Sequence, residues 1–403
     1  MKIKDIVRFH SETTTPIPDV VYHLYSLPSF DNNQTREELL GQDIQSNKFT
    51  VPNRCILFNK LNVRFKRIWR IDSDENHKIA STEFLPLIID ENKVDFDYCF
   101  YLLASPAITD YLCGQNANTS GSHKRIDPTN FFNIGIKLPP LAQQYEIGKL
   151  LSSLDTKIKL NRQINQNLEA MAKQLYDYWF VQFDFPNEEG KPYKSSGGAM
   201  VWNEKLKRNI PIGWNNGTLI DIANITMGQS PDGTSYNEIG DGVLFYQGST
   251  DFGMRFPSVR QYTTAPSRLA KKGDILMSVR APVGAVNIAN NDCCIGRGLS
   301  ALNSKIGSTT HLYYILNDLR IAFDQRNAVG TTFGSITKED LYSLPIIIPA
   351  KEVISAFDKI CSPMFDRQML LGEEIDSLIK QRDELLPLLM NGQVSVNSDL
   401  SAH

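Results

Sequence analysis

Residue types that could support catalysis are few in this sequence, and they are not clustered. Asp19, Glu91 and Lys93 can be combined into a nuclease-like set, as a Pro-Asp pair followed at a distance by Glu-x-Lys. Such a set would hold a metal ion and activate water, but its two parts lie far apart with no supporting motif. The sequence has no P-loop, and no Asn or Asp precedes a Pro-Pro-aromatic run, the usual catalytic loop of amino-methyltransferases.

Histidines and cysteines show no spacing typical of metal ligands. The histidines considered are His10, His23, His77, His123 and His311. They form no pairs at ligand spacing, which is typical of ordinary surface or core histidines. The cysteines are Cys55, Cys99, Cys113, Cys293, Cys294 and Cys361. They include no C-x-x-C, and the adjacent pair fits neither a disulfide framework nor a zinc site, so we expect reduced thiols in a cytoplasm.

A basic segment interleaved with aromatic residues is the best local candidate for nucleic-acid binding in the first half. Residues 54–62 and 63–71 are predicted to be strands. Alternation along the second strand would place Arg64 and Lys66 on one face and Phe65, Arg67 and Trp69 on the other. Two interpretations remain open: a strand that binds nucleic acid, or a half-buried strand with a solvated basic edge.

Net charge gives no support for DNA binding. The formal net charge is −3, and neither globular half has a basic surplus, whereas nucleic-acid binders usually do. DNA binding would need local basic faces, or a partner that supplies most of the phosphate contacts.

One long amphipathic helix, predicted for residues 138–185, organises the chain. Its apolar positions alternate steps of three and four, the spacing of a heptad seam, which suits a partner helix better than a broad core. An ordinary core helix is the alternative. The predicted seam positions are Ile147, Leu150, Leu154, Lys157, Asn161, Ile164, Leu168, Met171, Leu175 and Tyr178.

The same pattern returns 210 residues later. The corresponding positions are Phe357, Ile360, Met364, Arg367, Leu371, Glu374, Leu378, Gln381, Leu385 and Leu388. Residues 126–140 align on residues 336–350 without a gap, with Pro139 over Pro349, and a basic residue interrupts both seams at Lys157 and Arg367. The chain is therefore predicted to be an internal duplication of the form domain, helix, domain, helix.

Other elements follow from local signals. We predict a short helix near residues 34–40, a helix over 96–112 that Pro106 breaks or restarts, and a helix over 311–320. Residues 271–289 are predicted to form a turn and two strands, with Ile275 and Leu276 corresponding to Ile56 and Leu57. In the second long helix we expect a break at Pro363. We expect the helix to stop at Gly392.

Length and composition suit a soluble globular protein of two to three domains. The chain has 403 residues, of which 41% are hydrophobic and 22% charged. No run of eighteen apolar residues occurs, and residues 1–10 lack the apolar core of a signal peptide. We expect a cytoplasmic protein without a membrane segment.

Several stretches strongly resemble the specificity (S) subunits of type I restriction-modification systems, over essentially the whole chain. The resemblance is carried by LPPLAQQYEIGKLL from Leu138, by the tract LYDYWFVQFDFPNEEGKPYKSSGGAMVWNEKLKRNIPIGW from Leu175, by GDILMSVRAPVG and CCIGRGLSAL, and by LLPLLMNGQVSV from Leu385. One departure is that IPIGW and GQSP, which open the second domain, have no recognisable counterpart near the start of the first.

The resemblance implies an α+β (mixed α/β) fold with two target recognition domains, joined by two long helices that form an antiparallel coiled coil with a pseudo-twofold repeat. It implies recognition domains at 1–138 and 211–349, spacer helices at 139–185 and 350–396, a linker at 186–210 and a tail at 397–403. The long helix would act as a ruler of roughly 40 residues, about 60 Å, that sets the gap between two half-sites.

By the same resemblance the chain recognises a bipartite, asymmetric site in double-stranded DNA and performs no chemistry. Its partners would be two methyltransferase (M) subunits and, through them, restriction (R) subunits. It would hold no cofactor, because S-adenosylmethionine, ATP and magnesium would lie in the partner subunits. The alternatives are a coiled-coil scaffold without DNA contact and a self-sufficient nuclease or methyltransferase.

Candidate DNA-binding residues follow from residue type and loop position alone, with polar groups matching base-edge donors and acceptors. In the first domain they are Lys60, Arg64, Lys66, Arg67, Ser122, His123, Lys124 and Arg125. In the second domain they are Gln229, Ser230, Arg255, Arg280, Arg297, Thr331 and Thr332. No catalytic or metal-binding residue is assigned. A solvated or structural role remains open for each of them, and the DNA sequence recognised does not follow from the chain.

Overall fold

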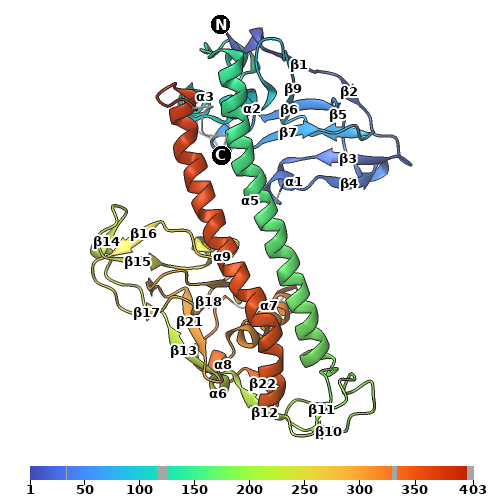
Figure 1. The fold of residues 1–403 in the computed structure, drawn as a ribbon, viewed down its shortest axis with the longest axis vertical. Coiled ribbons are helices and arrows are strands. Elements are labelled where there is room, and N and C mark those ends of the chain that lie inside the picture. Colours follow the sequence, from blue (N-terminus) through green and yellow to red (C-terminus); the bar gives the residue numbers. More distant parts are fainter. Residues whose placement is uncertain (33, 116–124, 329–333, 397–403) are drawn as a thin grey trace, which may run out of the picture. The chain divides into compact units, whose positions relative to one another are not determined.

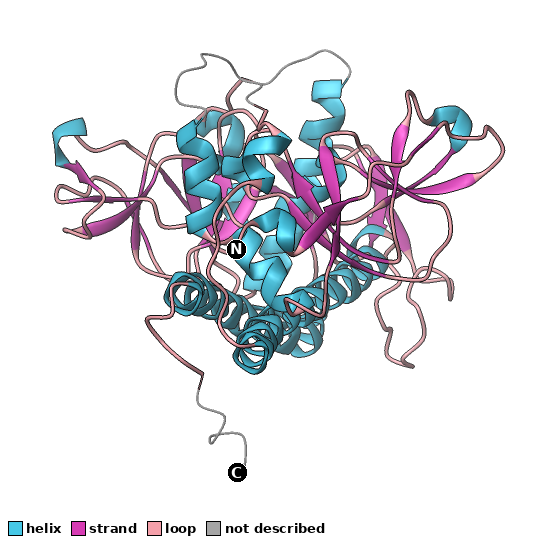
Figure 2. Cartoon of the chain, turned by 90° about the horizontal axis from the view of Figure 1, so that it is seen from above, coloured by secondary structure: helices cyan, strands magenta, loops and turns pink. Residues whose placement is uncertain are grey.

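The computed structural model describes residues 1–32, 34–115, 125–328 and 334–396. The chain divides into two compact units: unit 1 is Met1–Lys159 with Asp376–His403, and unit 2 is Leu160–Ile375. Two long helices, α5 (Leu141–Tyr176) and α9 (Lys351–Met390), contribute residues to both units. Strands and helices are both abundant (Figure 2), so the predicted α+β class is confirmed.

Unit 1 contains two sheets (Figure 1) with the orders β1-β9-β6-β7 and β2-β5-β8-β3-β4. Neighbouring strands are antiparallel except β3 and β8, which are parallel. The strands are β1 (Val7–Phe9), β2 (Thr13–Thr14), β3 (Val21–Tyr25), β4 (Glu37–Leu40), β5 (Lys48–Thr50), β6 (Arg54–Asn59), β7 (Ile68–Asp72), β8 (Lys78–Ala80) and β9 (Phe84–Ile89).

Unit 2 also contains a four-stranded sheet, β13-β21-β18-β19, and a five-stranded one, β14-β16-β15-β20-β17. Its only parallel pair among the described strands is β15 with β20. The strands of these sheets are β13 (Ala223–Met227), β14 (Tyr236–Asn237), β15 (Val243–Tyr246), β16 (Gln261–Thr263), β17 (Leu269–Ala270), β18 (Ile275–Ser278), β19 (Val286–Ile288), β20 (Cys293–Ile295) and β21 (Leu299–Ser304). Two strand pairs complete the unit: β10 (Met200–Asn203) with β11 (Arg208–Pro211), and β12 (Asn215–Thr218) with β22 (Pro345–Ile348).

The two units repeat each other in all but one edge strand. In chain order β1 to β9 correspond to β13 to β21, and the four-stranded orders are then identical. In the five-stranded sheets β2 pairs with β5, whereas its counterpart β14 pairs with β16, the counterpart of β4. Ile56 faces Leu87 across β6 and β9, while Ile275 faces Leu302 across β18 and β21. This register confirms that Ile56 corresponds to Ile275, and it confirms the internal duplication predicted from the helices.

The start of unit 1 has a structural counterpart in unit 2 that begins after IPIGW, so that segment and GQSP remain without a counterpart in the sequence of the first half. The Lys2 amide donates to Asp5 Oδ2 (2.6 Å), as the Thr218 amide donates to Asp221 Oδ2 (2.7 Å). The short segments η1 (Ile3–Asp5) and α6 (Leu219–Ile222) follow these caps. The matching sequences that follow these caps are IKDI from Ile3 and LIDI from Leu219.

The remaining helices are short, apart from α7. They are α1 (Leu27–Asp31), α2 (Phe96–Ala104), α3 (Pro106–Gln115) and α4 (Pro128–Phe132) in unit 1, and α7 (Thr309–Ala328) and α8 (Lys338–Tyr342) in unit 2. Pro106 starts α3, as predicted. The helix expected near residues 34–40 is wrong: Glu37–Leu40 is β4, because pairing with β3 outweighs local helix propensity.

The seam of α5 is predicted correctly at every second position and is one residue off at the others. Ile147, Leu154, Asn161 and Leu168 are buried or half-buried, as predicted. The intervening buried residues are Leu151, Ile158, Asn165 and Ala172, each next to a predicted position; of those predicted positions Leu150 and Ile164 are half-buried, and Lys157 and Met171 are exposed. Lys157 and Arg367 are therefore exposed and do not interrupt the seams, while the offset of 210 still relates buried Leu151 to buried Cys361.

Within each unit, α5 and α9 run antiparallel. In unit 1, Asp155 accepts from Arg382 Nη1 (2.8 Å). In unit 2, Glu374 accepts from Asn161 Nδ2 (2.9 Å), and the Tyr176 ring lies 6.3 Å from the Phe357 ring. As the residue number on α5 rises from Asn161 to Tyr176, that of its partner on α9 falls, which confirms the predicted antiparallel pairing.

The break expected at Pro363 does not occur. Helix α9 is continuous from Lys351 to Met390 and ends before Gly392, whose φ of 69° is the expected helix stop. Pro363 and Lys359 both lie on the exposed side. The Lys359 carbonyl, which lacks its usual amide donor because of the proline, can therefore be hydrated by solvent, so the helix tolerates the ring.

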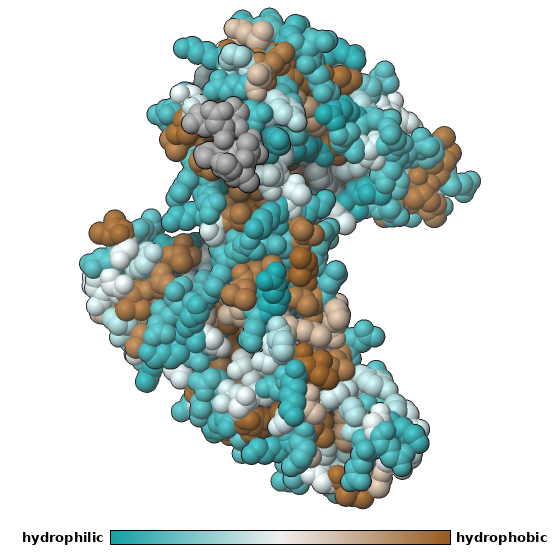
Figure 3. Space-filling view, in the orientation of Figure 1, coloured by the Kyte–Doolittle hydropathy of each residue, from teal (hydrophilic) through white to brown (hydrophobic). Residues whose placement is uncertain are grey.

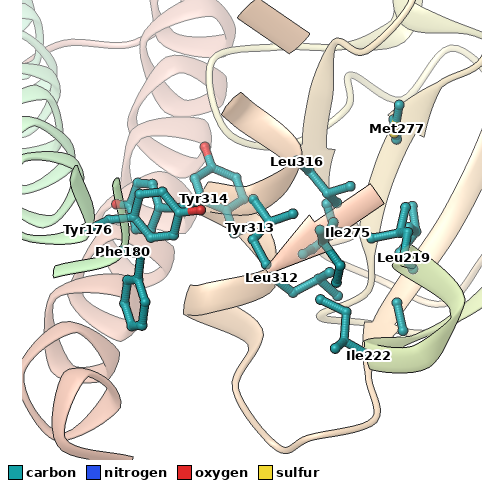
Figure 4. Packing of buried hydrophobic residues seen from close by; sticks show 14 of the residues in the cluster. Tyr176, Phe180, Leu219, Ile222, Ile275, Met277, Leu312, Tyr313, Tyr314 and Leu316 are labelled. Atoms are coloured by element: carbon teal, nitrogen blue, oxygen red, sulfur yellow. The ribbon is translucent and has the colours of Figure 1, made fainter. Parts of the chain in front are cut away.

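The core of unit 2 joins the end of α5 to α7, α9 and the four-stranded sheet. Figure 4 shows Tyr176 beside Tyr314 of α7, with Leu316 pointing toward Ile275 of the sheet. Phe180 belongs to η4 (Asp177–Val181), a π-helical turn that continues α5. The long helix is thus part of the core rather than an appended spacer.

His311 in this core makes unit 2 sensitive to acid. Its side chain is 1% exposed, its ring packs 4.6 Å from that of Phe180, and Nδ1 has no partner among the described residues. Burial lowers the pKa of His311 to about 3. The unfolded chain binds this proton below about pH 6.5 and the folded chain does not, so stability falls as the pH drops from 6.5 toward 3.

We expect the acid sensitivity to decrease in a His311→Phe variant. Between pH 7.5 and pH 5, wild type should lose about 2 kcal/mol more of its free energy of unfolding than the variant does. The reason is that pH 5 lies about 1.5 units below the unfolded-state pKa of histidine, about 6.5, and each unit costs about 1.4 kcal/mol. Urea unfolding at both pH values measures this. Equal losses in the two proteins would contradict it.

Candidate nucleic-acid interface

Three predicted residues of the second domain meet at one cavity in unit 2. Its volume is about 180 Å³. The lining residues are Ser230, Gln247, Gly248, Ser249, Thr250, Arg280, Ala281, Arg297 and Gly298. They come from four loops, which follow β13, β15, β18 and β20. Ser230, Arg280 and Arg297, far apart in the sequence, are thereby brought together as candidate ligand-binding residues.

Close packing of two loops builds one wall of this cavity. The Gln229 amide donates to the Ile295 carbonyl (3.0 Å), and the Arg297 amide donates to Ser230 Oγ (3.3 Å). Glycine at position 228 permits this approach, because an added Cβ would collide with the Gly296 carbonyl. Exposed Gln229 itself lies beside the cavity rather than in its lining.

The loop after β18 presents Arg280. Ser278 Oγ accepts from the Ala285 amide (2.9 Å) and donates to the Pro282 carbonyl (2.5 Å), while Val283 is buried. These contacts fix the loop at both ends and leave the Arg280 side chain exposed.

The cavity offers donors and positive charge but no carboxylate. Within the described part of the chain, neither Arg280 nor Arg297 forms an ion pair with an acidic side chain. The nearby acid Asp251 is 7% exposed and is neutralised by Arg260. Guanidinium, amide and hydroxyl groups together can bind phosphate oxygens or base edges. Among the residues described, no cluster of His, Cys, Asp and Glu could hold a metal ion.

Arg255 is not part of this surface, so its assignment as a DNA-binding residue is wrong. The side chain is 7% exposed, and Nη1 lies 3.3 Å from Glu169 Oε2 and 3.3 Å from the Tyr313 hydroxyl. Its guanidinium also lies 4.4 Å from the centre of the Phe365 ring. Arg255 therefore fastens the recognition part of unit 2 to α5, α7 and α9, a role that residue type alone does not reveal.

In unit 1 the predicted basic strand is in fact a loop followed by a strand. Residues 63–65 form the turn η3 (Val63–Phe65), and β7 begins at Ile68, so the expected alternation is wrong. Arg64 and Lys66 are exposed. Left-handed backbone at Asn62 and Lys66, with φ of 52° and 46°, curls the segment away from extended structure.

Two predicted cations of unit 1 are already paired. Arg67 donates to both carboxylate oxygens of Asp31, at 2.7 and 2.6 Å, and Arg125 pairs with Glu83. Lys60 is half-buried, and its backbone bonds to Glu83 and Ile126. Among the residues described, the exposed cations of this loop that form no ion pair are Arg64 and Lys66, and half-buried Lys60 has no acidic partner either.

The remaining candidates lie outside the described residues. They are Ser122, His123, Lys124, Thr331 and Thr332. Residues just after these segments are described: Leu61 bridges Arg125, and Arg280 bridges Ser335 in the same way. The repeat therefore extends to the loops of the candidate interface.

Six of the cavity residues were not predicted from the sequence: Ala281 and Gly298, which adjoin predicted arginines, and the segment Gln247, Gly248, Ser249 and Thr250. No local charge or motif marks this segment. The signal that could have found it is structural, because it follows β15, which pairs in parallel with β20, the strand that precedes Arg297. Parallel neighbours end at the same edge, so the loops after them meet.

In the described part of the chain, no helix is both long and apolar enough to cross a lipid bilayer. A family model for the type I restriction modification DNA specificity domain matches residues 1–170 and 211–361. The candidate specificity subunit of the type I restriction enzyme MjaX from Methanocaldococcus jannaschii is 30% identical over 378 residues, which cover 90% of this chain and 83% of that protein.

Two further comparisons agree. The specificity subunit of the type I restriction enzyme HindI from Haemophilus influenzae is 24% identical, covering 84% of this chain and 86% of that protein. The crystal structure of a type I restriction-modification S subunit from M. genitalium superposes with a TM-score of 0.59 at 14% identity, covering 96% and 95% of the two chains, which shows a common fold. With the family model matching both halves of the duplication, this chain belongs to the specificity subunits of type I restriction-modification systems.

Proposed function

We propose that this chain is the DNA-recognition subunit of a type I restriction-modification complex, with each unit reading one half of a bipartite, asymmetric site. The observation that carries this proposal is the duplication: two similar units present loops with cations that form no ion pair among the described residues. These cations are Arg64 and Lys66 after β6 in unit 1, and in unit 2 Arg280 after the equivalent β18 and Arg297 after β20. Two similar folds with different loop residues are suited to two different half-sites.

The chain itself performs no chemistry in this proposal. Methyltransferase (M) subunits, two per chain, would carry S-adenosylmethionine, and restriction (R) subunits joined through them would use ATP and magnesium. The net charge of −3 suits this division, because the partners would then supply a share of the phosphate contacts. The assembly would be cytoplasmic.

The paired helices are the proposed docking surface for the M subunits. Pairing of α5 with α9 leaves several apolar side chains more than a third exposed, and Figure 3 shows apolar side chains along the helices between hydrophilic neighbours. These residues are Leu141, Tyr145, Leu160, Met171, Ile360, Leu370 and Leu388. Further helices from a partner would cover them in a bundle, and the 36 residues of α5, about 54 Å long, would contribute to the spacing of the half-sites.

Mapping methylated bases tests the proposal. Purified alone, the chain should neither methylate nor cut DNA, and together with M subunits it should direct methylation of one bipartite sequence. Replacing residues 1–138 by the first domain of another specificity subunit should change one half-site and leave the other unchanged. Catalysis by the isolated chain would instead favour a self-sufficient enzyme, and a complex without sequence preference would favour a scaffold.

If the arginines of the unit 2 cavity bind DNA, replacing them should change the affinity for DNA and its dependence on salt concentration. Arg280→Ala and Arg297→Ala should each weaken binding of the assembled complex to its site. A cation that contacts phosphate should reduce the slope of log affinity against log salt by about 1, whereas one that reads a base should lose about 1–3 kcal/mol of discrimination at one position. Titrations at several salt concentrations measure both. Arg255→Met, at a buried arginine, is the comparison that should leave the slope unchanged.

A further inference from the structure

An exposed aromatic side chain lies among cations in the loop between β6 and β7, residues 60–67. Phe65 is 51% exposed. The guanidiniums of Arg64 and Arg67 lie over its ring, 4.7 and 4.8 Å from the centre. Covering the exposed part of a phenylalanine ring with a binding partner is favourable, because it removes apolar surface from water. Here its immediate neighbours on the loop, Arg64 and Lys66, are charged.

The loop holds this side chain in a fixed position. Asn59 at the end of β6 accepts from the Leu61 amide (2.8 Å) and donates back to the Leu61 carbonyl (2.5 Å). Val63 is 5% exposed and anchors the turn in the core of unit 1. The Phe65 amide donates to the Asn62 carbonyl (3.1 Å), which closes the turn. Phe65 is therefore presented by a preorganised loop rather than by a free strand end.

Arg67 has a supporting role in this arrangement. Its two bonds to Asp31 at 2.7 and 2.6 Å are bidentate, and its side chain is only 15% exposed. Bidentate pairing fixes the plane of the guanidinium, and that plane lies over Phe65. Arg67 thus positions the ring, while Arg64 and Lys66 have no acidic partner among the residues described.

The equivalent loop of unit 2 is built in the same way with a different tip. Ser278 takes the place of Asn59 and clamps its loop, and buried Val283 takes the place of Val63. The exposed side chains lie at different points of the two loops: Arg280 lies between Ser278 and Val283, at the position of Leu61, whereas Phe65 lies two residues after Val63. A common scaffold with a variable tip is what two readers of different sequences require.

The residues around Phe65 limit the kinds of group that it can contact in a binding partner. Two unpaired cations favour a polyanion, but phosphate contacts alone need no aromatic ring. Stacking on a base would compete with the guanidiniums of Arg64 and Arg67, which both lie over the ring. Contact through the hydrocarbon edge of the ring would leave both guanidiniums in place. The apolar group that a duplex offers beside its phosphates is the 5-methyl group of thymine, in the major groove.

We propose that Phe65 reads the 5-methyl group of a thymine in one half-site, with Arg64 and Lys66 binding the adjacent backbone. This inference rests on the proposed function, because it requires that unit 1 binds a specific duplex sequence. It adds a specificity-determining residue and the group that it recognises.

Replacing thymine by uracil removes this methyl group and nothing else. The experiment uses the chain assembled with its M subunits and duplexes carrying the mapped site, in which each thymine of both half-sites is changed to uracil in turn. Wild type should lose about four-fold in affinity at one thymine of a single half-site, the equivalent of one buried methyl group. Phe65→Ala should bind the unmodified duplex more weakly by a similar factor and lose nothing further at that position.

Two controls distinguish a loss of thymine recognition from a general loss of structure or assembly. Val21→Ala changes another half-exposed apolar residue of unit 1. Val21 is the first residue of β3 and is not part of the loop between β6 and β7. This variant should keep the wild-type response to uracil. Both variants should also keep the wild-type affinity losses at substitutions in the other half-site, which shows that the complex is assembled and bound.

Two results would overturn the proposal for Phe65. One is that Phe65→Ala responds to every uracil substitution as wild type does, and the other is that neither half-site contains a thymine on either strand whose methyl group affects binding. A wild-type complex without any sequence preference is a different outcome, because it contradicts DNA recognition by the chain as a whole.

Discussion

Replacing Phe357 by alanine should lower the free energy of unfolding of unit 2 by about 3–5 kcal/mol. Its side chain is 0% exposed, and it lies where α9 meets the end of α5. The rings of Phe180, Trp179 and Tyr176 lie 5.0, 6.0 and 6.3 Å from it. Removal of the ring leaves a cavity among large aromatic residues that cannot easily collapse to fill it.

Urea unfolding, followed by amide hydrogen exchange in α7 and the sheet of unit 2, measures this loss. Ile360→Ala is the matched control, because Ile360 lies one turn further along α9 and is 44% exposed. We expect a change within about 0.5 kcal/mol there. Phe357→Leu should recover more than half of the loss. Similar effects of Phe357→Ala and Ile360→Ala would contradict the packing described for α9.

Gly228→Ala should impair both the stability of unit 2 and its proposed recognition surface. A Cβ at this position would collide with the Gly296 carbonyl and lie 2.7 Å from that of Leu299. Both obstacles are backbone, so the loop after β13 must move. We expect a loss of about 1–3 kcal/mol in stability. We also expect more than ten-fold weaker binding at one half-site, because Ser230 and Arg297 would separate.

Gly233→Ala provides the control on the same loop. No atom lies within 4 Å of an added Cβ there, so stability and binding should be close to wild type. Thermal unfolding and affinity for duplexes altered in one half-site at a time measure the two effects. Two results for Gly228→Ala would contradict the assignment of this cavity to one half-site. One is an equal loss of affinity at both half-sites, and the other is an unchanged affinity.

The long helices and their duplication could be predicted because they depend on a period sustained over many turns. The one-residue error in the seam has a simple cause. Leu150 and Leu151 are both apolar, as are Met171 and Ala172, so these pairs fit either phase. The other two pairs disagree, because Lys157–Ile158 favours the observed phase and Ile164–Asn165 the predicted one, and packing against the partner helix decides between them. The supposed basic interruption of the seam disappeared with the correct phase.

The candidate site was less predictable, because it depends on which strands are neighbours. Residue type alone selected Arg280 and Arg297, which line one cavity, but it also selected Arg255, whose burial beside Glu169 and Tyr313 depends on tertiary packing. Residues 63–65 were assigned to a strand because the turn there depends on left-handed backbone at Asn62 and Lys66. Neither residue is a glycine, so the sequence gives no strong turn signal.

The division of the chain between the units has a consequence for its synthesis. Unit 2 is one uninterrupted stretch, Leu160–Ile375, whereas unit 1 needs Asp376–His403 in addition to its first 159 residues. The core of unit 1 includes Leu386 and Leu389 of α9. On the ribosome the unit that is translated first therefore cannot complete its core until almost the whole chain has emerged. Unit 2 can therefore finish folding before unit 1, although it is translated later. Until α9 has been synthesised, the side of α5 that packs against α9 stays exposed to solvent.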